Sequence, residues 1–326
     1  MKKDVSKPRE IPSVAGGALW ADQTNEKLYL FGGEFTDGLA KEKTAAIYEY
    51  DPWVDKWSEM PDSAGKTTSR PSFGSHTVVE HSGKGYYYGG WLGQNSVPGW
   101  TGPRQALNSM IIYDMQQNTV LNVTGPTGQD PRVEGVLMYV PVGDNGLLVS
   151  FGGMYAEDGR EDKIRAAPMS EIDVFDAASS EWYRLNATGD IPTPRRRFCG
   201  GIISAEDGTS HNAYVYGGAE VAGTSAGADD VFILSMPSFR WIKYWEAEIP
   251  NYHNGFTCDV VNDSQMIIIG GTFPYSDECD SAHGAQGGHY LDLGRANAEL
   301  VEWYGYRKDL KGYEVPEDIT KVIGGG

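Results

Sequence analysis

The chain has 326 residues, and its 45 acidic side chains outnumber its 27 basic ones, which gives a formal net charge of −18. This surplus argues against nucleic acid and anionic membrane surfaces as partners, because a phosphate backbone is bound by clustered positive charge. Glycine is unusually frequent: 42 glycines make up about 13 % of the chain, against roughly 7 % in average proteins. Together with 12 % aromatic residues, this composition indicates many short strands and tight turns and excludes a disordered chain.

The first thirteen residues begin with basic side chains but contain no apolar run. They therefore do not have the pattern of a signal peptide. No later stretch approaches ~18 consecutive apolar residues, which argues against a transmembrane helix.

Five glycine doublets follow along the chain at intervals of about sixty residues, and each ends a short apolar run. A second strand-like run comes before each apolar run, and a long polar loop, a third run and a large apolar residue come after the doublet. In the first repeat these features are Ala18–Trp20, Leu28–Phe31 with Gly32 and Gly33, Ala46–Asp51, and Trp57. The later doublets begin at Gly89, Gly152, Gly217 and Gly270. Each repeat predicts a four-stranded antiparallel meander, and such meanders stack radially into a β-propeller.

The predicted fold class is therefore all-β, with five countable blades in a propeller domain at residues 14–307. The blades are expected at about residues 14–60, 71–124, 131–187, 194–248 and 252–304. The doublets are expected where a Cβ atom would crowd a turn or where the backbone needs a positive φ. The aromatic residues expected to pack between blades are Tyr48, Trp57, Tyr113, Trp182 and Trp241.

An apolar run ending in Gly-Gly, then Tyr-Asp, then Trp resembles the kelch repeat over residues 12–307. More narrowly, the chain resembles the kelch ectodomains of fungal cell-surface proteins. The residues that carry this resemblance are Gly16–Asp22, Ser264–Gly271 between Cys258 and Cys279, and Tyr313–Pro316.

Those fungal relatives have a signal peptide, a further upstream blade and usually a membrane span. The resemblance therefore implies that this chain is a fragment, with residues 1–13 as the remnant of an upstream sixth blade or a linker. Residues 308–326 are expected to be a tail or linker. A fragment would have unpaired sheet edges and a tendency to associate, and a genuine ring of five blades is the alternative.

In a four-stranded meander, the loop after strand two and the connection to the next blade leave from the same end. The long loops, at 34–45, 91–109, 154–170, 219–229 and 272–288, should therefore gather on one face. Aromatic rings beside charged groups suit a glycan or peptide ligand. The residues expected on this ligand-binding face are Trp91, Trp100, Arg104, Arg132, Tyr155, Arg195, Arg197, His253, Phe273 and Tyr275. The alternatives are that the aromatic rings pin their own loops and that the arginines pair with neighbouring blades.

Three cysteines allow one internal disulfide and leave one thiol. Cys258 and Cys279 should lie near the same end of the last blade, so we hypothesise that they pair. Glycosylation sequons begin at Asn122, Asn186 and Asn262, each in a predicted surface turn. With the fungal resemblance, these features favour an extracellular or cell-surface location for the parent protein.

Two alternatives involve a metal. A copper-radical oxidase resembling galactose oxidase would use Cys199, Tyr252, His253 and His283 or His289, but Tyr252 would have to fill two tyrosine roles, so that site is incomplete. Asp277, Asp280 and His283 offer oxygen and imidazole ligands that suit iron or manganese. Their spacing departs from that of the iron-binding kelch proteins of plant glucosinolate breakdown. The sequence thus predicts a non-catalytic recognition module without a cofactor, whose partner is an extracellular or cell-wall glycan or a protein.

Overall fold

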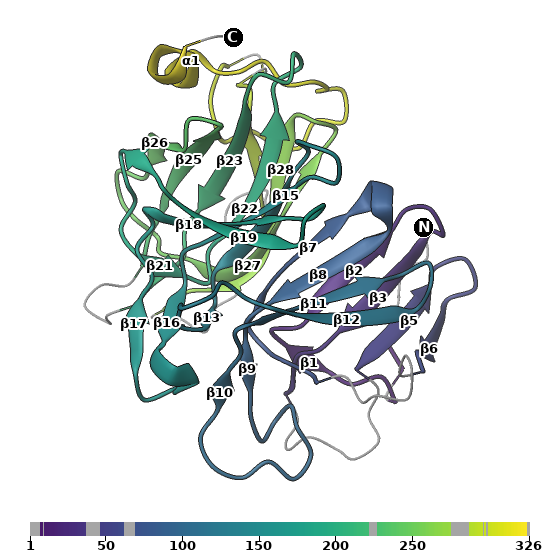
Figure 1. The fold of residues 1–326 in the computed structure, drawn as a ribbon. Helices are drawn as coiled ribbons and strands as arrows, with labels where there is room; N and C mark the ends of the chain where they lie inside the picture. Colours follow the sequence, from purple (N-terminus) through teal and green to yellow (C-terminus); the bar gives the residue numbers. More distant parts are fainter. Residues whose placement is uncertain are drawn as a thin grey trace. The chain divides into compact units, whose positions relative to one another are not determined.

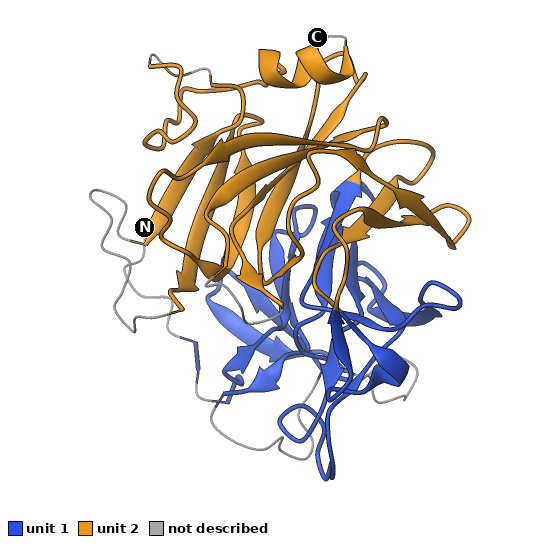
Figure 2. Cartoon of the chain, turned by 90° about the vertical axis from the view of Figure 1, so that its left-hand side faces the viewer, with its two compact units in different colours: residues 1–139, 155–165 blue, residues 140–154, 166–326 orange. Residues whose placement is uncertain are grey.

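The computed structural model describes residues 7–8, 10–36, 46–61, 69–221, 227–274, 287–295, 297 and 299–324. The chain divides into two compact units: unit 1 comprises residues 1–139 and 155–165, and unit 2 comprises residues 140–154 and 166–326 (Figure 2). Nearly every regular element is a β-strand (Figure 1). Within the described residues, the α-helix α1 (Glu317–Ile323) is short, and no helix is long and apolar enough to cross a membrane.

The first two sheets, in unit 1, are four-stranded antiparallel meanders. The first contains β2 (Ala18–Asp22), β3 (Lys27–Phe31), β5 (Ile47–Asp51) and β6 (Lys56–Glu59). The second contains β7 (Ser75–Val79), β8 (Lys84–Tyr88), β11 (Ser109–Asp114) and β12 (Thr119–Thr124). In β2, buried and exposed residues alternate, as they do in a strand with one packed face.

Three further sheets follow along the chain. The third contains β14 (Val136–Val140), β15 (Leu147–Phe151), β18 (Glu171–Asp176) and β19 (Glu181–Asn186). The fourth contains β22 (Cys199–Ser204), β23 (His211–Tyr216), β25 (Asp230–Met236) and β26 (Arg240–Glu246), with the short β20 (Thr188–Gly189) parallel to β26. The fifth contains β27 (Asn254–Val261), β28 (Gln265–Thr272) and β29 (Gly288–Asp292), and a bridge joins Leu291 to Trp303.

Four small sheets of two or three short strands form in the connections beside the first four large sheets. They are β1 (Val14–Ala15) with β4 (Glu34–Phe35), β9 (Trp91–Leu92) with β10 (Gln105–Ala106), β21 (Arg195–Arg196) with β24 (Ala219–Glu220), and β13 (Arg132–Val133) with β16 (Met154–Ala156) and β17 (Ile164–Ala166).

Aromatic side chains fill the space between neighbouring sheets, as predicted for Tyr113 and Trp241 but not for Trp57 and Trp182. Trp20 is fully buried and stacks on Phe31 at 5.1 Å and Tyr113 at 6.0 Å between ring centroids. Tyr48 and Trp241 are also buried. Trp57 and Trp182 are half-buried and pack on the neighbouring strand of their own sheet, at 5.0 Å from Tyr50 and Phe175.

Each sheet is preceded by a lead-in segment, and the glycine doublets hold these segments in place. The lead-in segments are Val14–Gly16, Pro71–Phe73, Arg132–Glu134, Arg195–Arg197 and His253–Gly255. In four sheets, the N–H of the second doublet glycine donates to the first carbonyl of the next lead-in segment. These bonds are Gly33 to Pro71 (2.8 Å), Gly90 to Arg132 (3.3 Å), Gly153 to Arg195 (2.8 Å) and Gly218 to His253 (2.9 Å). All ten doublet glycines have positive φ, which confirms the expected conformation.

The last residue of each lead-in segment also has positive φ, whether or not it is glycine. In Phe73, Glu134 and Arg197 this angle is 53°, 55° and 53°. The N–H of Phe73 donates to the carbonyl of Gly16, that of Glu134 to Phe73 and that of Gly255 to Arg197, each at 2.8 Å. Neighbouring sheets within a unit are therefore linked by a second set of backbone bonds.

The C-terminal segment packs on unit 2, contrary to the expectation of a tail or linker. The hydroxyl of Tyr313 is buried, 3.0 Å from that of Tyr214, and Ile319 of α1 is fully buried. Arg295 forms an ion pair with Asp318 at 2.6 Å. These side chains bury apolar surface that a linker would expose, so residues 313–323 belong to the core of unit 2.

A pair of glycine substitutions tests the packing of the doublets. A Cβ atom on Gly89 would overlap the carbonyl oxygen of Arg132, whereas one on Gly99 would meet no described atom within 4 Å. Their φ angles, 70° and 71°, are matched. We expect Gly89→Ala to lower the free energy of unfolding by about 3 kcal/mol and Gly99→Ala by about 1 kcal/mol in urea titrations. Equal losses of unfolding free energy in the two variants would contradict the close approach of Gly89 to the carbonyl of Arg132.

Candidate functional site

The loop after strand two of the second sheet forms a hairpin, which we call the finger (residues 91–106). In Figure 1 the hairpin of β9 and β10 extends away from the sheets of unit 1. The carbonyl of Gly93 accepts from the N–H groups of Ser96 at 3.0 Å and Val97 at 2.8 Å. Near the tip, the indole N–H of Trp100 donates to the carbonyl of Pro103 at 3.1 Å. These local bonds give the finger a defined shape.

Loops on both sides brace the finger. On one side, the N–H of Phe35 donates to the carbonyl of Asn95 at 2.9 Å. On the other, the backbone N–H and Nε of Arg104 donate to Oε2 of Glu161 at 2.7 and 3.2 Å. The amide of Gln105 also reaches the carbonyl of Asp158 at 3.1 Å. We call this connected surface of unit 1 the loop face; it comprises residues 34–36, 91–106 and 155–165.

Two aromatic residues expected as open platforms are buried instead. Trp91 is 1 % exposed and lies beneath the guanidinium of Arg104, whose Cζ is 5.0 Å from the centroid of the indole. Tyr155 is also 1 % exposed, with the guanidinium groups of Arg132 and Arg165 at 4.7 and 4.4 Å from the ring centroid. The expectation of open rings is therefore wrong for both residues, because arginine side chains cover them. The alternative that they pin their loops is the one observed.

The other aromatic candidates differ in placement. Trp100 is half-exposed near the tip of the finger. In unit 2, Phe273 stacks on the buried ring of His253, with centroids 4.3 Å apart and planes 8° from parallel. Tyr275 lies outside the described residues. Of the predicted aromatic residues, Trp100 is the one that the structure places on the loop face with its ring partly open.

The predicted arginines divide into buried and exposed groups. Arg132 is buried and donates to the hydroxyl of Tyr155 at 2.7 Å, and Arg195 is buried in an ion pair with Asp230. Burying these charges requires such partners. Both named partners lie in the same predicted blade as the arginine, so these contacts are not the salt bridges to a neighbouring blade that the alternative describes. Arg197 is half-buried at the end of its lead-in segment, and Arg104 is partly exposed.

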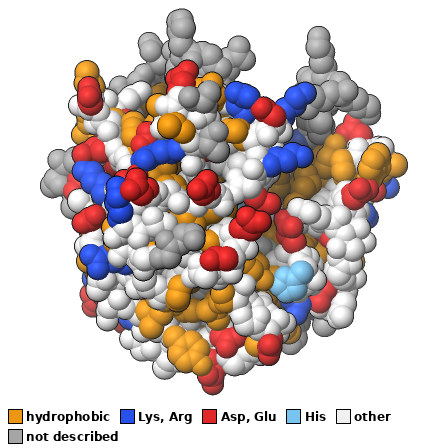
Figure 3. Space-filling view, turned by 90° about the horizontal axis from the view of Figure 1, so that it is seen from above, with side chains coloured by type: hydrophobic (Ala, Val, Ile, Leu, Met, Phe, Trp, Pro, Cys, Tyr) orange, Lys and Arg blue, Asp and Glu red, His pale blue; other side chains and the backbone are white. Residues whose placement is uncertain are grey.

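Charged side chains on the loop face are largely paired with one another. Arg165 pairs with Asp130 at 2.9 Å, Arg160 with Asp162 at 2.6 Å and Lys163 with Glu157 at 3.0 Å. Elsewhere, acidic side chains are spread over the face drawn in Figure 3, with basic side chains among them. On this face the negative charge is thus spread among basic side chains and does not form a single patch.

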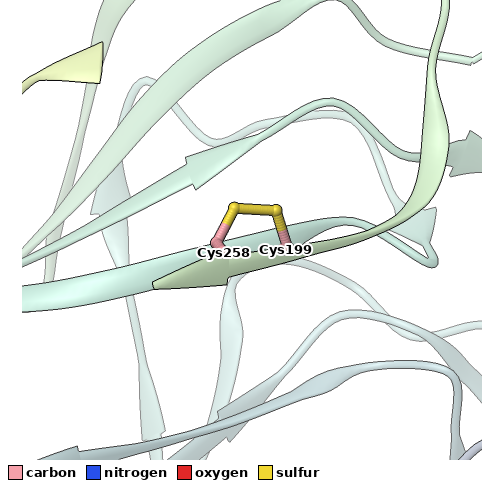
Figure 4. The surroundings of a disulfide bond; sticks show 2 residues. All are labelled: Cys199 and Cys258. Atoms are coloured by element: carbon pink, nitrogen blue, oxygen red, sulfur yellow. A yellow bond between two sulfur atoms is a disulfide. The ribbon is translucent and has the colours of Figure 1, made fainter. Parts of the chain in front are cut away.

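The disulfide joins Cys199 of β22 to Cys258 of β27, with Cα atoms 5.5 Å apart (Figure 4). The hypothesis of a Cys258–Cys279 pair is therefore wrong. The two bonded residues are 59 positions apart, about one repeat, so they occupy the first strands of adjacent sheets. Sequence reasoning considered pairing within one blade and missed this relation. Cys279 lies outside the described residues.

This disulfide also bears on the oxidase alternative. The sulfur of Cys199, which that alternative would link to a tyrosine, is bonded to Cys258. His253 and His289 do lie together in unit 2, with ring centroids 6.0 Å apart. Asp277, Asp280 and His283 are outside the described residues. Among the residues that are described, no three His, Cys, Asp or Glu side chains are grouped to hold a metal ion.

All three sequon asparagines are exposed, but they do not all lie in turns. Asn262 lies in the turn between β27 and β28, as predicted. Asn122 lies within β12, and Asn186 is the last residue of β19. Both strands are the outermost in their sheets, which explains the exposure without a turn.

Comparisons with known proteins agree with the repeat. Residues 2–208 match the model of the KLHDC2/KLHL20/DRC7 Kelch-repeats domain. The chain is 30 % identical to a Kelch repeat-containing protein of Arthroderma benhamiae, over 96 % of this chain and 54 % of that protein. It is 22 % identical to the Acyl-CoA-binding domain-containing proteins 4 and 5 of Arabidopsis thaliana, over 82 % and 88 % of this chain and 36 % and 37 % of those proteins.

The fold class predicted from the sequence, an all-β kelch-type β-propeller of four-stranded antiparallel blades, is thereby confirmed. The chain belongs to the Kelch-repeat family. Kelch-repeat domains generally serve as protein-interaction modules. The chain spans about half the length of its fungal relative and little more than a third of the plant relatives.

The disulfide can be tested by peptide mapping of the non-reduced protein. We expect a cross-linked peptide pair containing Cys199 and Cys258. Replacing both residues by alanine should lower the free energy of unfolding by about 4 kcal/mol, because the bond closes a long loop of the unfolded chain. A peptide pair joining Cys258 to Cys279 would contradict the observed pairing.

Proposed function

We propose that the chain is a non-catalytic recognition module that binds a protein partner through the loop face of unit 1. The braced finger is the observation that carries this proposal. Its backbone is bonded to the segment at Phe35 on one side and to Glu161 on the other. A loop that is already ordered loses less conformational entropy when it binds, so more of the contact energy is available for affinity.

The composition of this face favours a protein over a glycan. A sugar needs an open aromatic ring to cover its C–H surface, and the rings of Trp91 and Tyr155 are covered by arginines. The face exposes part of Trp100 together with charged side chains, among them Arg104 and Arg165 and the carboxylates of Asp158 and Asp162. Tryptophan and arginine are the residue types enriched among the strongest contributors to protein–protein binding.

The cysteines and sequons support a location outside the cytosol. Disulfides persist in oxidising compartments and are rare in the cytosol, and this one joins two sheets of unit 2. Asn122, Asn186 and Asn262 are exposed, as N-glycosylation requires. We therefore extend the proposal to a partner met outside the cell or at the cell surface.

Two exposed tryptophans of unit 1 provide a matched test. Trp100 lies on the finger, whereas Trp53 is 76 % exposed in the turn between β5 and β6 and is not part of the loop face. The protein would be screened in parallel against an array of secreted and cell-surface ectodomains and against a glycan array. For each ectodomain that binds, we expect Trp100→Ala to weaken affinity by at least about thirtyfold and Trp53→Ala to leave it unchanged.

Three outcomes would contradict the proposal. Binding to glycans alone would replace the protein partner with a sugar. If the two substitutions weakened affinity equally, or if only Trp53→Ala weakened it, the loop face would not be the binding surface. Thermal unfolding of both variants controls for loss of fold.

A further inference from the structure

The finger ends in a tip, residues 97–103, that stands clear of its surroundings in unit 1. Five of these seven residues are exposed, and Val97 and Trp100 are half-exposed. A Cβ atom on Gly99 or Gly102 would meet no described atom within 4 Å. The described bonds that brace the finger all come from residues outside this range. We call residues 97–103 the finger tip.

The finger tip carries no charge, and several of its hydrogen-bond donors are already used. Its sequence, Val-Pro-Gly-Trp-Thr-Gly-Pro, contains no ionisable side chain, and its two prolines have no N–H group. The backbone N–H of Trp100 donates to the carbonyl of Val97 at 3.2 Å, and the indole N–H donates to that of Pro103 at 3.1 Å. The ring of Trp100 can therefore enter an apolar environment without leaving its own donor unpaired.

The segment beside the base of the finger, residues 155–165, has the opposite chemistry. Seven of its eleven residues are charged. Its ion pairs include Arg160 with Asp162 and Lys163 with Glu157. A partner that lay across this segment would remove water from these pairs, and their mutual attraction repays that desolvation poorly. The loop face thus consists of an uncharged protrusion and a charged, internally paired base.

We infer that the finger tip inserts into an apolar pocket of the protein partner, with the ring of Trp100 as the innermost group, while residues 155–165 stay in water. This inference rests on the proposed function and specifies how the loop face is used. An apolar pocket fits the finger tip because the tip has no charge to desolvate and its shape is formed before binding. A flat partner surface would instead have to cover the ion pairs at the base.

Hydrogen exchange measured by mass spectrometry distinguishes insertion from a flat contact. The probe is the ectodomain that binds most tightly in the ectodomain array, and the unmodified chain is measured with and without it. Saturating ectodomain should slow exchange of the backbone amides of residues 99–102 at least about tenfold, because the pocket excludes water, and should change exchange in residues 155–165 by less than about twofold.

A matched pair of charge insertions provides a second test. Thr101→Glu places a carboxylate on the exposed finger tip. Val54→Glu places one in the turn between β5 and β6, on a side chain that is 66 % exposed and outside the loop face. We expect Thr101→Glu to weaken affinity for the same ectodomain at least about a hundredfold, because an unpaired charge would have to enter the pocket, and Val54→Glu to leave it unchanged.

Contrary results separate this inference from the proposed function. Slowed exchange in residues 155–165 to the same degree as in the finger tip would overturn insertion and leave the loop face as the binding surface. Unslowed exchange at residues 99–102, or full affinity of a folded Thr101→Glu variant, would also overturn it. If no ectodomain bound, the proposed function itself would fail, and this inference with it. Thermal unfolding checks both variants, and the exchange measurement depends on neither.

Discussion

One backbone hydrogen bond, from the second glycine of a doublet to the next lead-in segment, organises much of this structure. It occurs at Gly33, Gly90, Gly153 and Gly218, with lengths of 2.8 to 3.3 Å. The bond needs a left-handed backbone that glycine adopts at little cost, and in these sheets the first glycine leaves no room for a side chain. The bond also sets where each lead-in segment lies. In unit 1, Ser72 of a lead-in segment exchanges two backbone hydrogen bonds, of 2.9 and 2.7 Å, with Trp91 at the base of the finger. The repeat and the candidate site therefore have a common cause.

The repeat was predictable from the sequence because glycine, aromatic and apolar residues each meet a distinct physical need in every sheet. The backbone bonds between lead-in segments were not predictable. They require left-handed backbones at Phe73, Glu134 and Arg197, and these residue types do not signal that conformation. The partner of Cys258 was missed because Cys199 lies about one repeat away, in another sheet. Tyr313 lies outside the repeat, in a segment with no strand pattern, so its burial could not be predicted. It nevertheless packs in the core of unit 2.

The candidate site also has features that were predictable from the sequence and features that were not. The sequence indicated which loops are long and that aromatic and arginine residues gather on them. It could not tell which rings would be covered, because Arg104 reaches Trp91, and Arg132 reaches Tyr155, only when the loops fold together. Trp91 and Tyr155 therefore pack within their loops and do not present open rings to a sugar. Trp100 is the partly open ring of the finger.

Amide hydrogen exchange, followed by NMR, tests the central role of the doublet bond most directly. The N–H groups of Gly33, Gly90, Gly153 and Gly218 should exchange slowly. Fast exchange at these four glycines would contradict the account.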